Sequence, residues 1–211
     1  PGLCRLDPNT GVGDPTPAFT YCLNLAEVEV DTATGKTTVL RFTCVSDVGK
    51  VGNIDSVNGQ AFGGISHAIG FALGENYDDV KKHTNIAASG VPYIETIPDE
   101  IEAIYYERPD ESGPFGSSGA SEGFQSSGHM AVLNGIYNAC GVRVYEMPAS
   151  PEKVKAGIDT LAAGGKITPP KKYFLGSDLY EELENIRANP VKVGPEDYFV
   201  PLGGSTTDRF F

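Results

Sequence analysis

The sequence contains no tryptophan, only two methionines and comparatively few basic residues. Its 16 Lys and Arg residues are outnumbered by 28 Asp and Glu residues, which gives a formal net charge of -12 at pH 7. Nucleic-acid binding depends on clustered basic side chains that neutralise phosphates. The charge balance therefore argues against a nucleic-acid partner, and we expect none.

Long hydrophobic runs are missing as well. No apolar segment approaches the ~18 residues that a membrane-spanning helix requires, so we expect no membrane association. The N-terminus also has no leader of basic, apolar and small residues of the kind that directs secretion. Together with the free cysteines, this pattern favours the cytoplasm. Because the first residue is Pro1 rather than methionine, we expect a processed product, a subunit or a piece of a longer polypeptide.

The four cysteines lack the spacing of a metal site. Cys4, Cys22, Cys44 and Cys140 form no CxxC pair and have no histidine at a suitable distance in the sequence. A zinc or iron–sulfur site formed by this chain alone is therefore not expected. We interpret the cysteines as reduced and mostly buried thiols, and we predict no residue that binds a metal directly.

What the sequence does contain indicates a globular α+β fold. A chain of 211 residues is long enough to bury roughly 70% of its unfolded surface. Residues 21–31 alternate apolar and polar side chains with a slip near Leu25 and Ala26, and residues 37–48 are rich in β-branched residues. With the turn ATGK between them, these segments predict a β-hairpin. Residues 100–109 and 141–147 are predicted as further strands.

Apolar residues at a spacing close to 3.6 predict a helix over residues 55–73, capped by Asp55 or Ser56. The helix contains Gly59, Gly63, Gly64 and Gly70, each of which costs up to ~1 kcal/mol relative to alanine inside a helix. Tight packing against other elements or a nearby ligand would explain why glycines are present inside this helix. We expect another part of the protein or a ligand to lie close to its N-terminal half. The amide of Gln60, at that end, is able to donate and accept hydrogen bonds.

Further helices are predicted over 124–140, with Ser126 and Ser127 as candidate caps, from about Pro151 to Ala163, and within 177–190. The predicted fold is thus a β-hairpin and short strands packed with glycine-rich helices.

A segment rich in glycine and serine, GPFGSSGASEGFQSS, leads into the helix predicted over 124–140 and carries a single carboxylate, Glu122. Its unshielded N–H groups, beside a helix N-terminus, suit an anion. A carboxylate would repel an anion unless it transfers a proton. The alternative is that Glu122 caps the helix and the serines solvate a turn.

The remaining polar candidates have ordinary explanations. His67, His83 and His129 have no Ser or Cys nucleophile at a diagnostic spacing, so we expect them to be structural or exposed. Asp47, which follows the second hairpin strand and lies two residues before Gly49, is expected to form an Asx-type turn.

Three segments occur in one order: CVSDVGKVGNIDSVNGQAFGGISHAIGFAL, then EIEAIYYE, then GPFGSSGASEGFQSSGHMAVLNGIYNACGVRVYEMPASPEKV. In that combination and spacing they resemble the C-terminal part of the large molybdenum domain of the xanthine oxidase family, and within it the bacterial aldehyde oxidoreductases most. The resemblance covers roughly residues 18–160.

The resemblance implies roles for individual residues. GASEG places Glu122 at the position of the family's active-site base, and NGQ places Gln60 beside the molybdenum centre. The loop before the glutamate, which contacts the pterin cofactor in the family, corresponds here to Ser117, Ser118, Gly119, Ala120 and Ser121.

The resemblance also implies a function. The chain would be part of a molybdenum hydroxylase that oxidises aldehydes to carboxylic acids with water as the oxygen source. The cofactor would be molybdopterin, as its cytosine dinucleotide, with iron–sulfur clusters on other parts of the enzyme. Expected partners are the remaining half of the molybdenum domain, an iron–sulfur domain or subunit and a small aldehyde substrate, in a homodimer of the complete enzyme. The chain would not be active alone.

Two alternatives stay open: an N-heterocycle or purine-type hydroxylase of the same family, and a non-catalytic assembly subunit. The run SEGF differs from the GEPP-like run of many purine-acting members, which makes a purine substrate less favoured. We expect residues 1–165 to form the C-terminal part of the molybdenum-cofactor-binding domain, and residues 166–211 to form a linker, a helix and a C-terminal extension that lies over a neighbouring domain.

Overall fold

The computed structural model describes residues 6–13, 18–169, 185, 188 and 189. The chain divides after Ile167, and all the helices and strands whose bounds follow lie before that residue. Most of the predicted linker, helix and extension at 166–211 lies outside the described residues, so the proposed domain division stays a prediction.

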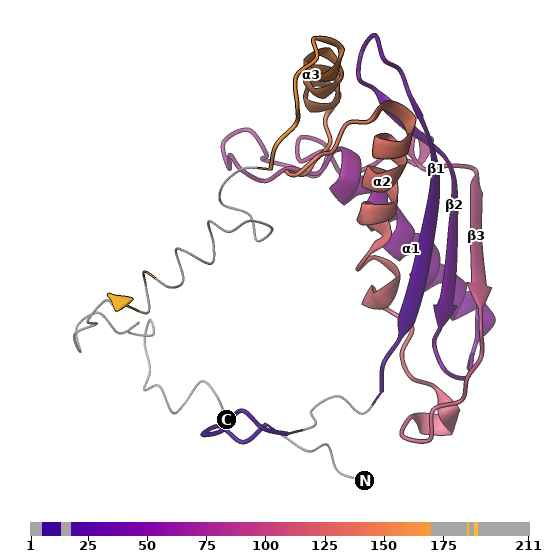
Figure 1. Cartoon of the computed structure of the whole chain (residues 1–211). Coiled ribbons are helices and arrows are strands. Elements are labelled where there is room, and N and C mark those ends of the chain that lie inside the picture. The colour runs from indigo at the N-terminus through magenta and orange to yellow at the C-terminus, as the bar shows by residue number, and fades with distance from the viewer. Residues whose placement is uncertain (1–5, 14–17, 170–184, 186–187, 190–211) are drawn as a thin grey trace. The chain divides into compact units, whose positions relative to one another are not determined.

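A three-stranded mixed sheet forms one layer, in the order β1-β2-β3 (Figure 1). Strands β1 (Tyr21–Val30) and β2 (Thr37–Asp47) are antiparallel, which confirms the predicted hairpin. Strand β3 (Glu100–Tyr105) pairs with β2 in parallel. The described residues therefore combine an antiparallel and a parallel pair.

The hairpin has one irregularity in its register. The register shifts between Glu27 and Val28, so that Leu40 on β2 has no partner on β1. Strand β1 itself alternates between exposed and half-buried residues without a break. The consecutive apolar residues Leu25 and Ala26 therefore do not interrupt the alternation in burial, and the extra residue belongs to the neighbouring strand.

The described residues form three α-helices: α1 (Ile54–Leu73), α2 (Gly128–Cys140) and α3 (Pro151–Ala162). Helices α1 and α2 pack against the sheet, and α3 follows α2 in the chain. Short 3-10 helices occur at Ile94–Thr96, Pro114–Gly116 and Glu122–Phe124. Figure 1 shows α2 lying beside β1. The α+β class and the positions of all three helices agree with the sequence prediction.

Two hydrophobic clusters stabilise this arrangement. The larger one buries Phe42 of β2, Ile65 of α1 and Val132 of α2 together with Phe124. The smaller one joins α2 to α3 through Ile136, Val142 and Val154. In the described part of the chain, no helix combines the length and the apolar character of a membrane span.

The predicted strand at 141–147 is wrong. The chain leaves α2 at Gly141, whose φ is 76°. Val142 is buried in the smaller cluster, where a Cβ at Gly157 would lie 2.5 Å from its Cγ1 atom. A strand requires a neighbouring strand to pair with, and among the described residues this segment has none. Its apolar residues instead serve as a packing surface for α3.

Asn53 caps α1, because its side-chain oxygen accepts a hydrogen bond from the backbone N–H of Ser56 at 2.9 Å. The predicted cap at Asp55 or Ser56 is wrong, since both residues lie inside the first turn.

Replacing the cap is expected to destabilise α1. Asn53→Ala should lower the free energy of unfolding by about 0.5–2 kcal/mol, whereas Ser56→Ala should stay within about 0.5 kcal/mol because its N–H donor is retained. Thermal unfolding of the two variants measures the difference. Equal losses in both would mean that Asn53 is not the cap.

Candidate functional site

The parallel pairing of β2 and β3 brings two distant segments to one edge of the sheet. Both strands end there, β2 leading to the start of α1 and β3 leading to the glycine and serine loop. The backbone N–H of Lys50 donates to the carbonyl of Gly116 at 2.7 Å, and that of Ser118 donates to Val48 at 2.9 Å. Two segments far apart in the sequence are thus joined backbone to backbone.

Asp47 prepares this contact. Its carboxylate accepts a hydrogen bond from the N–H of Gly49 at 3.0 Å, which confirms the predicted turn. Gly49 has a φ of 70°, and a Cβ there would lie 2.4 Å from the carbonyl oxygen of Gly116. Only glycine allows the two backbones to approach so closely.

The loop that carries Glu122 is fixed at both ends. The Thr20 hydroxyl donates to the carbonyl of Gly119 at 2.9 Å, and the side chain of Asn24 donates to the Ser127 hydroxyl at 2.9 Å. Between them, Phe124 is fully buried in the larger cluster. Glu122 therefore lies on a short turn that is anchored by the core.

Gln60 and Glu122 line the same groove, although 61 residues separate them in the sequence. The groove has a volume of about 330 Å³ and lies between α1 and the 121–125 turn. Its lining consists of Gly59, Gln60, Gly63, Gly64, His67, Ser121, Glu122 and Gln125. Three predicted site residues, Gln60, Ser121 and Glu122, are thus brought together.

The glycines of α1 fall into two kinds. A Cβ at Gly64 would lie 2.7 Å from the Cβ of Phe124, and one at Gly70 would lie 2.8 Å from Pro92. These two glycines permit close packing. A Cβ at Gly59 or Gly63 would meet no atom within 4 Å, so packing does not account for them. They line the groove with bare backbone and leave room above it for an occupant.

The capping interpretation of Glu122 is wrong. Helix α2 begins at Gly128, its N-cap is Ser127, and no side chain caps it. The Ser127 hydroxyl is used by Asn24 instead. With the residues that the structure describes, the carboxylate of Glu122 forms neither a hydrogen bond nor an ion pair, and it is exposed in the groove. Such a carboxylate is free to accept a proton from a bound molecule.

The other predicted cofactor contacts lie outside this groove. Ser117 pairs with Gly49, the Gly119 carbonyl accepts from Thr20, and Ala120 packs against the larger cluster. Ser118 lines a separate, polar hollow of about 520 Å³ together with Arg108. Its hydroxyl is buried and has no hydrogen-bond partner among the described residues. An unpaired buried hydroxyl indicates a polar group that is still to be supplied.

Sequence reasoning missed two residues of the groove. His67 is exposed, as expected, but its Nδ1 atom lies 2.8 Å from Oε1 of Gln125, and both residues line the groove. Gln60, Gly63 and His67 are spaced by three and four positions, which places them on one face of a helix. That spacing is the signal that could have revealed the role of His67.

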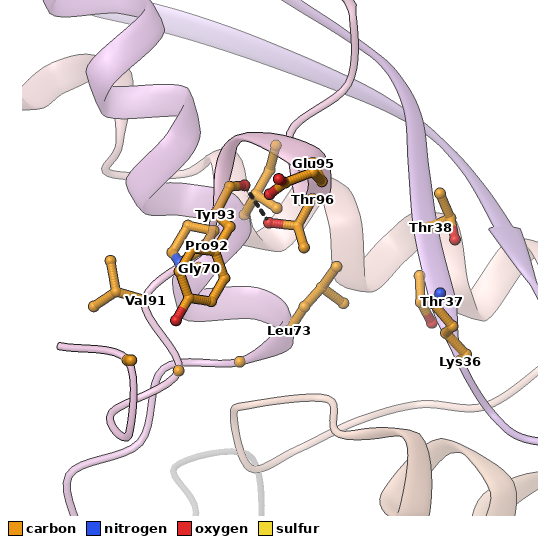
Figure 2. Close-up of a pocket in the computed structure, with 14 residues that line it drawn as sticks. Lys36, Thr37, Thr38, Gly70, Leu73, Val91, Pro92, Tyr93, Glu95 and Thr96 are labelled. Carbon is orange, nitrogen blue, oxygen red and sulfur yellow. Dashed lines mark hydrogen bonds between the residues drawn. The ribbon is translucent and has the colours of Figure 1, made fainter. Parts of the chain in front are cut away.

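A second hollow of about 300 Å³ lies at the other end of α1 (Figure 2). It is lined by the start of β2, the C-terminal turns of α1 and residues 87–96. Pro92 and Tyr93 lie on the same side of it as Gly70 in Figure 2. None of the predicted site residues contributes to this hollow.

Two cysteines interact across the hairpin. The hydrogen bond between the thiols of Cys22 and Cys44 lowers the pKa of Cys22 and raises the pKa of Cys44, where burial acts in the same direction.

Within the described residues, no group of three or more His, Cys, Asp and Glu side chains could hold a metal ion.

Cys22 is therefore expected to react with iodoacetamide about tenfold faster than Cys44, because the thiolate is the reactive form and because Cys44 is wholly buried. Mass spectrometry of partly alkylated, natively folded protein measures the order. Modification of Cys44 first would contradict it.

Residues 3–98 match the family model of a molybdopterin cofactor-binding domain. The aldehyde oxidoreductase of Megalodesulfovibrio gigas is 43% identical over 153 residues, which cover 72% of this chain and 17% of that protein. The crystal structure of the aldehyde oxidoreductase from Desulfovibrio desulfuricans is 48% identical, with a TM-score of 0.68, and the match covers 70% of this chain and 16% of that one. The structure of the aldehyde oxidoreductase from Desulfovibrio gigas is 42% identical, with a TM-score of 0.70. That match covers 73% of this chain and 17% of the other.

This chain thus spans about 17% of the length of the curated relative. The family model covers the segment that carries Gln60 and ends before Glu122, and the sequence identities and the structural similarity point to the same group of enzymes. Residues 3–98 of the chain are thus similar to a molybdopterin cofactor-binding domain, and the chain is similar to part of the aldehyde oxidoreductases of the xanthine oxidase family.

Proposed function

We propose that this chain supplies the catalytic base and part of the cofactor site of a molybdenum hydroxylase that oxidises aldehydes to carboxylic acids. The observation that carries the proposal is the groove itself: the carboxylate of Glu122, which has no partner among the described residues, lines the same hollow as Gln60 and the bare backbone of Gly63. The identity with an aldehyde oxidoreductase favours an aldehyde as the substrate.

The described residues fit a bulky polar cofactor. Gly59 and Gly63 leave space that a side chain would fill, and the buried hydroxyl of Ser118 lacks a partner among the described residues. When bound, the molybdenum cofactor would transfer an oxygen atom that derives from water and accept the electrons. The residues proposed to hold it are Gln60, Ser117, Ser118, Gly119, Ala120 and Ser121.

Glu122 would act as the general base. Its carboxylate is exposed in the groove and has no competing partner among the described residues, so it is free to remove the proton of the attacking oxygen. General base catalysis is typically worth ~10²–10⁴ in rate. Gln60, on the facing helix, has an amide that is able to both donate and accept a hydrogen bond and so orient the cofactor or the substrate.

Further parts of the enzyme would complete the site. The outer face of the sheet exposes Leu23, Leu25 and Ile104, an apolar surface of the kind that another part of a larger protein covers. The proposed partners are the other half of the molybdenum domain and an iron–sulfur domain or subunit that takes the electrons. The cytosine dinucleotide form of the cofactor, a homodimeric enzyme and a cytoplasmic location also belong to this proposal.

Native mass spectrometry of the natively purified particle that contains this chain, followed by substrate assays, tests the proposal. We expect mass for a molybdenum pterin and iron–sulfur clusters, and turnover of aldehydes in preference to N-heterocycles. Preference for N-heterocycles would change the substrate class. A particle without cofactor and without turnover would instead support the non-catalytic assembly subunit.

A further inference from the structure

One hydrogen bond joins the helix that carries Gln60 to the turn that carries Glu122. Nδ1 of His67 on α1 lies 2.8 Å from Oε1 of Gln125. His67 lies seven positions after Gln60, which corresponds to about 10 Å along the helix axis. The His67–Gln125 pair therefore lies towards one end of the groove, and Gln60 lies towards the other.

The chemistry of the pair fixes which atom donates. An amide oxygen only accepts hydrogen bonds, so Nδ1 of His67 carries the proton and donates it to Gln125.

The turn has few other attachments to α1. Phe124 is held in the core and packs closely on Gly64, which fixes the centre of the turn. Ser126 Oγ donates within the turn, to the carbonyl of Gly123. Among the described residues, His67 is the one side chain of α1 that forms a hydrogen bond with residues 121–125. The His67–Gln125 pair is thus the side-chain hydrogen bond that links α1 to the C-terminal end of this turn.

We propose that His67 is a positioning residue, which through Gln125 holds Glu122 at the correct place in the groove for proton transfer. The inference rests on the proposed function, because it presupposes that Glu122 is the base. A general base must lie within hydrogen-bond reach of the proton it removes, and a displacement of about 1 Å is able to lower the rate by ~10²-fold. His67 itself need not touch the substrate.

His67→Leu removes the hydrogen-bond donor and replaces the imidazole with an apolar side chain that is compatible with a helix. In the holoenzyme it is expected to lower kcat by roughly 10- to 100-fold with little change in KM, since binding groups are retained. His67→Asn places an amide N–H where Nδ1 was and should restore most of the lost kcat. Gln125→Leu should match His67→Leu, and the double variant should be no worse than either single one.

Hydrogen exchange of the holoenzyme gives a readout that does not depend on activity. Amides in the 119–126 segment should exchange faster in His67→Leu and Gln125→Leu, and the rate should return towards the wild-type value in His67→Asn. Molybdenum content should be unchanged in all three variants.

The inference is overturned if His67→Leu keeps full kcat, if it raises KM alone, or if the effects of His67→Leu and Gln125→Leu simply add. It is also overturned if His67→Asn is as impaired as His67→Leu. Glu122→Gln separates this failure from that of the proposed function. An inactive Glu122→Gln beside an active His67→Leu rejects only the positioning role, whereas an active Glu122→Gln rejects the base itself.

Discussion

Glu122→Gln is expected to lower kcat by ~10²–10⁴ while the cofactor stays bound. The amide has the size and shape of the carboxylate but is not able to accept the proton. Glu122 forms no hydrogen bond or ion pair with another described residue and is exposed, so its replacement should change the free energy of unfolding by less than about 0.5 kcal/mol. Steady-state assays with an aldehyde, together with molybdenum analysis of the same preparation, measure both quantities.

Glu146→Gln serves as the matched control, because it removes the same charge from an exposed residue that lies outside the groove. It should retain wild-type turnover. Normal turnover in Glu122→Gln would exclude the proposed base and leave the assembly subunit as the favoured function. A loss of molybdenum in Glu122→Gln would instead assign Glu122 a role in cofactor binding.

Adjacent glycines of α1 are expected to respond in opposite ways to substitution. Gly63→Leu should leave the folded chain at least as stable, since glycine inside a helix costs about 1 kcal/mol and a Cβ at this position meets no atom within 4 Å. Its side chain would fill the groove. Overpacking costs about 1–3 kcal/mol, which corresponds to roughly 5- to 150-fold weaker binding of whatever occupies the groove.

Gly64→Ala is the companion variant. Its single added carbon would lie 2.7 Å from the Cβ of Phe124 and 3.1 Å from the backbone nitrogen of Gln125, so it should destabilise the fold by about 1–3 kcal/mol. Melting temperature, molybdenum content and turnover are measured for both. Full cofactor content and full turnover in Gly63→Leu would mean that the groove binds neither cofactor nor substrate.

The elements that depend on local pattern could be predicted from the sequence. Among the described residues, the spacing of apolar residues predicted α1 and α2, and Pro151 indicated the start of α3. Alternation before the turn ATGK and β-branched residues after it predicted the hairpin. The segment 141–147 has the composition of a strand, but strand formation depends on a pairing partner, which composition does not reveal. The cap of α1 was misplaced by two or three residues because Asn53, Asp55 and Ser56 are all good capping residues.

The groove could be predicted only in part. The residues from which it is built, Gln60 and Glu122, were found through the resemblance of their segments. That they share one hollow follows from the parallel pairing of β2 and β3, which no local pattern encodes. The same holds for His67, whose partner Gln125 lies 58 residues away in the sequence.

The parallel pairing of β2 and β3 also places the connections that form the groove and the connection between α1 and β3 at opposite ends of these strands. Both connections that form the groove leave the sheet at one edge, whereas residues 74–99, which join α1 to β3, turn at the opposite edge. A change in the length of that connection leaves the backbone contacts between residues 48–50 and 116–118 intact. The fold therefore allows the end with the second hollow to diversify, for instance to suit different neighbours, while the chemistry at the other end is kept.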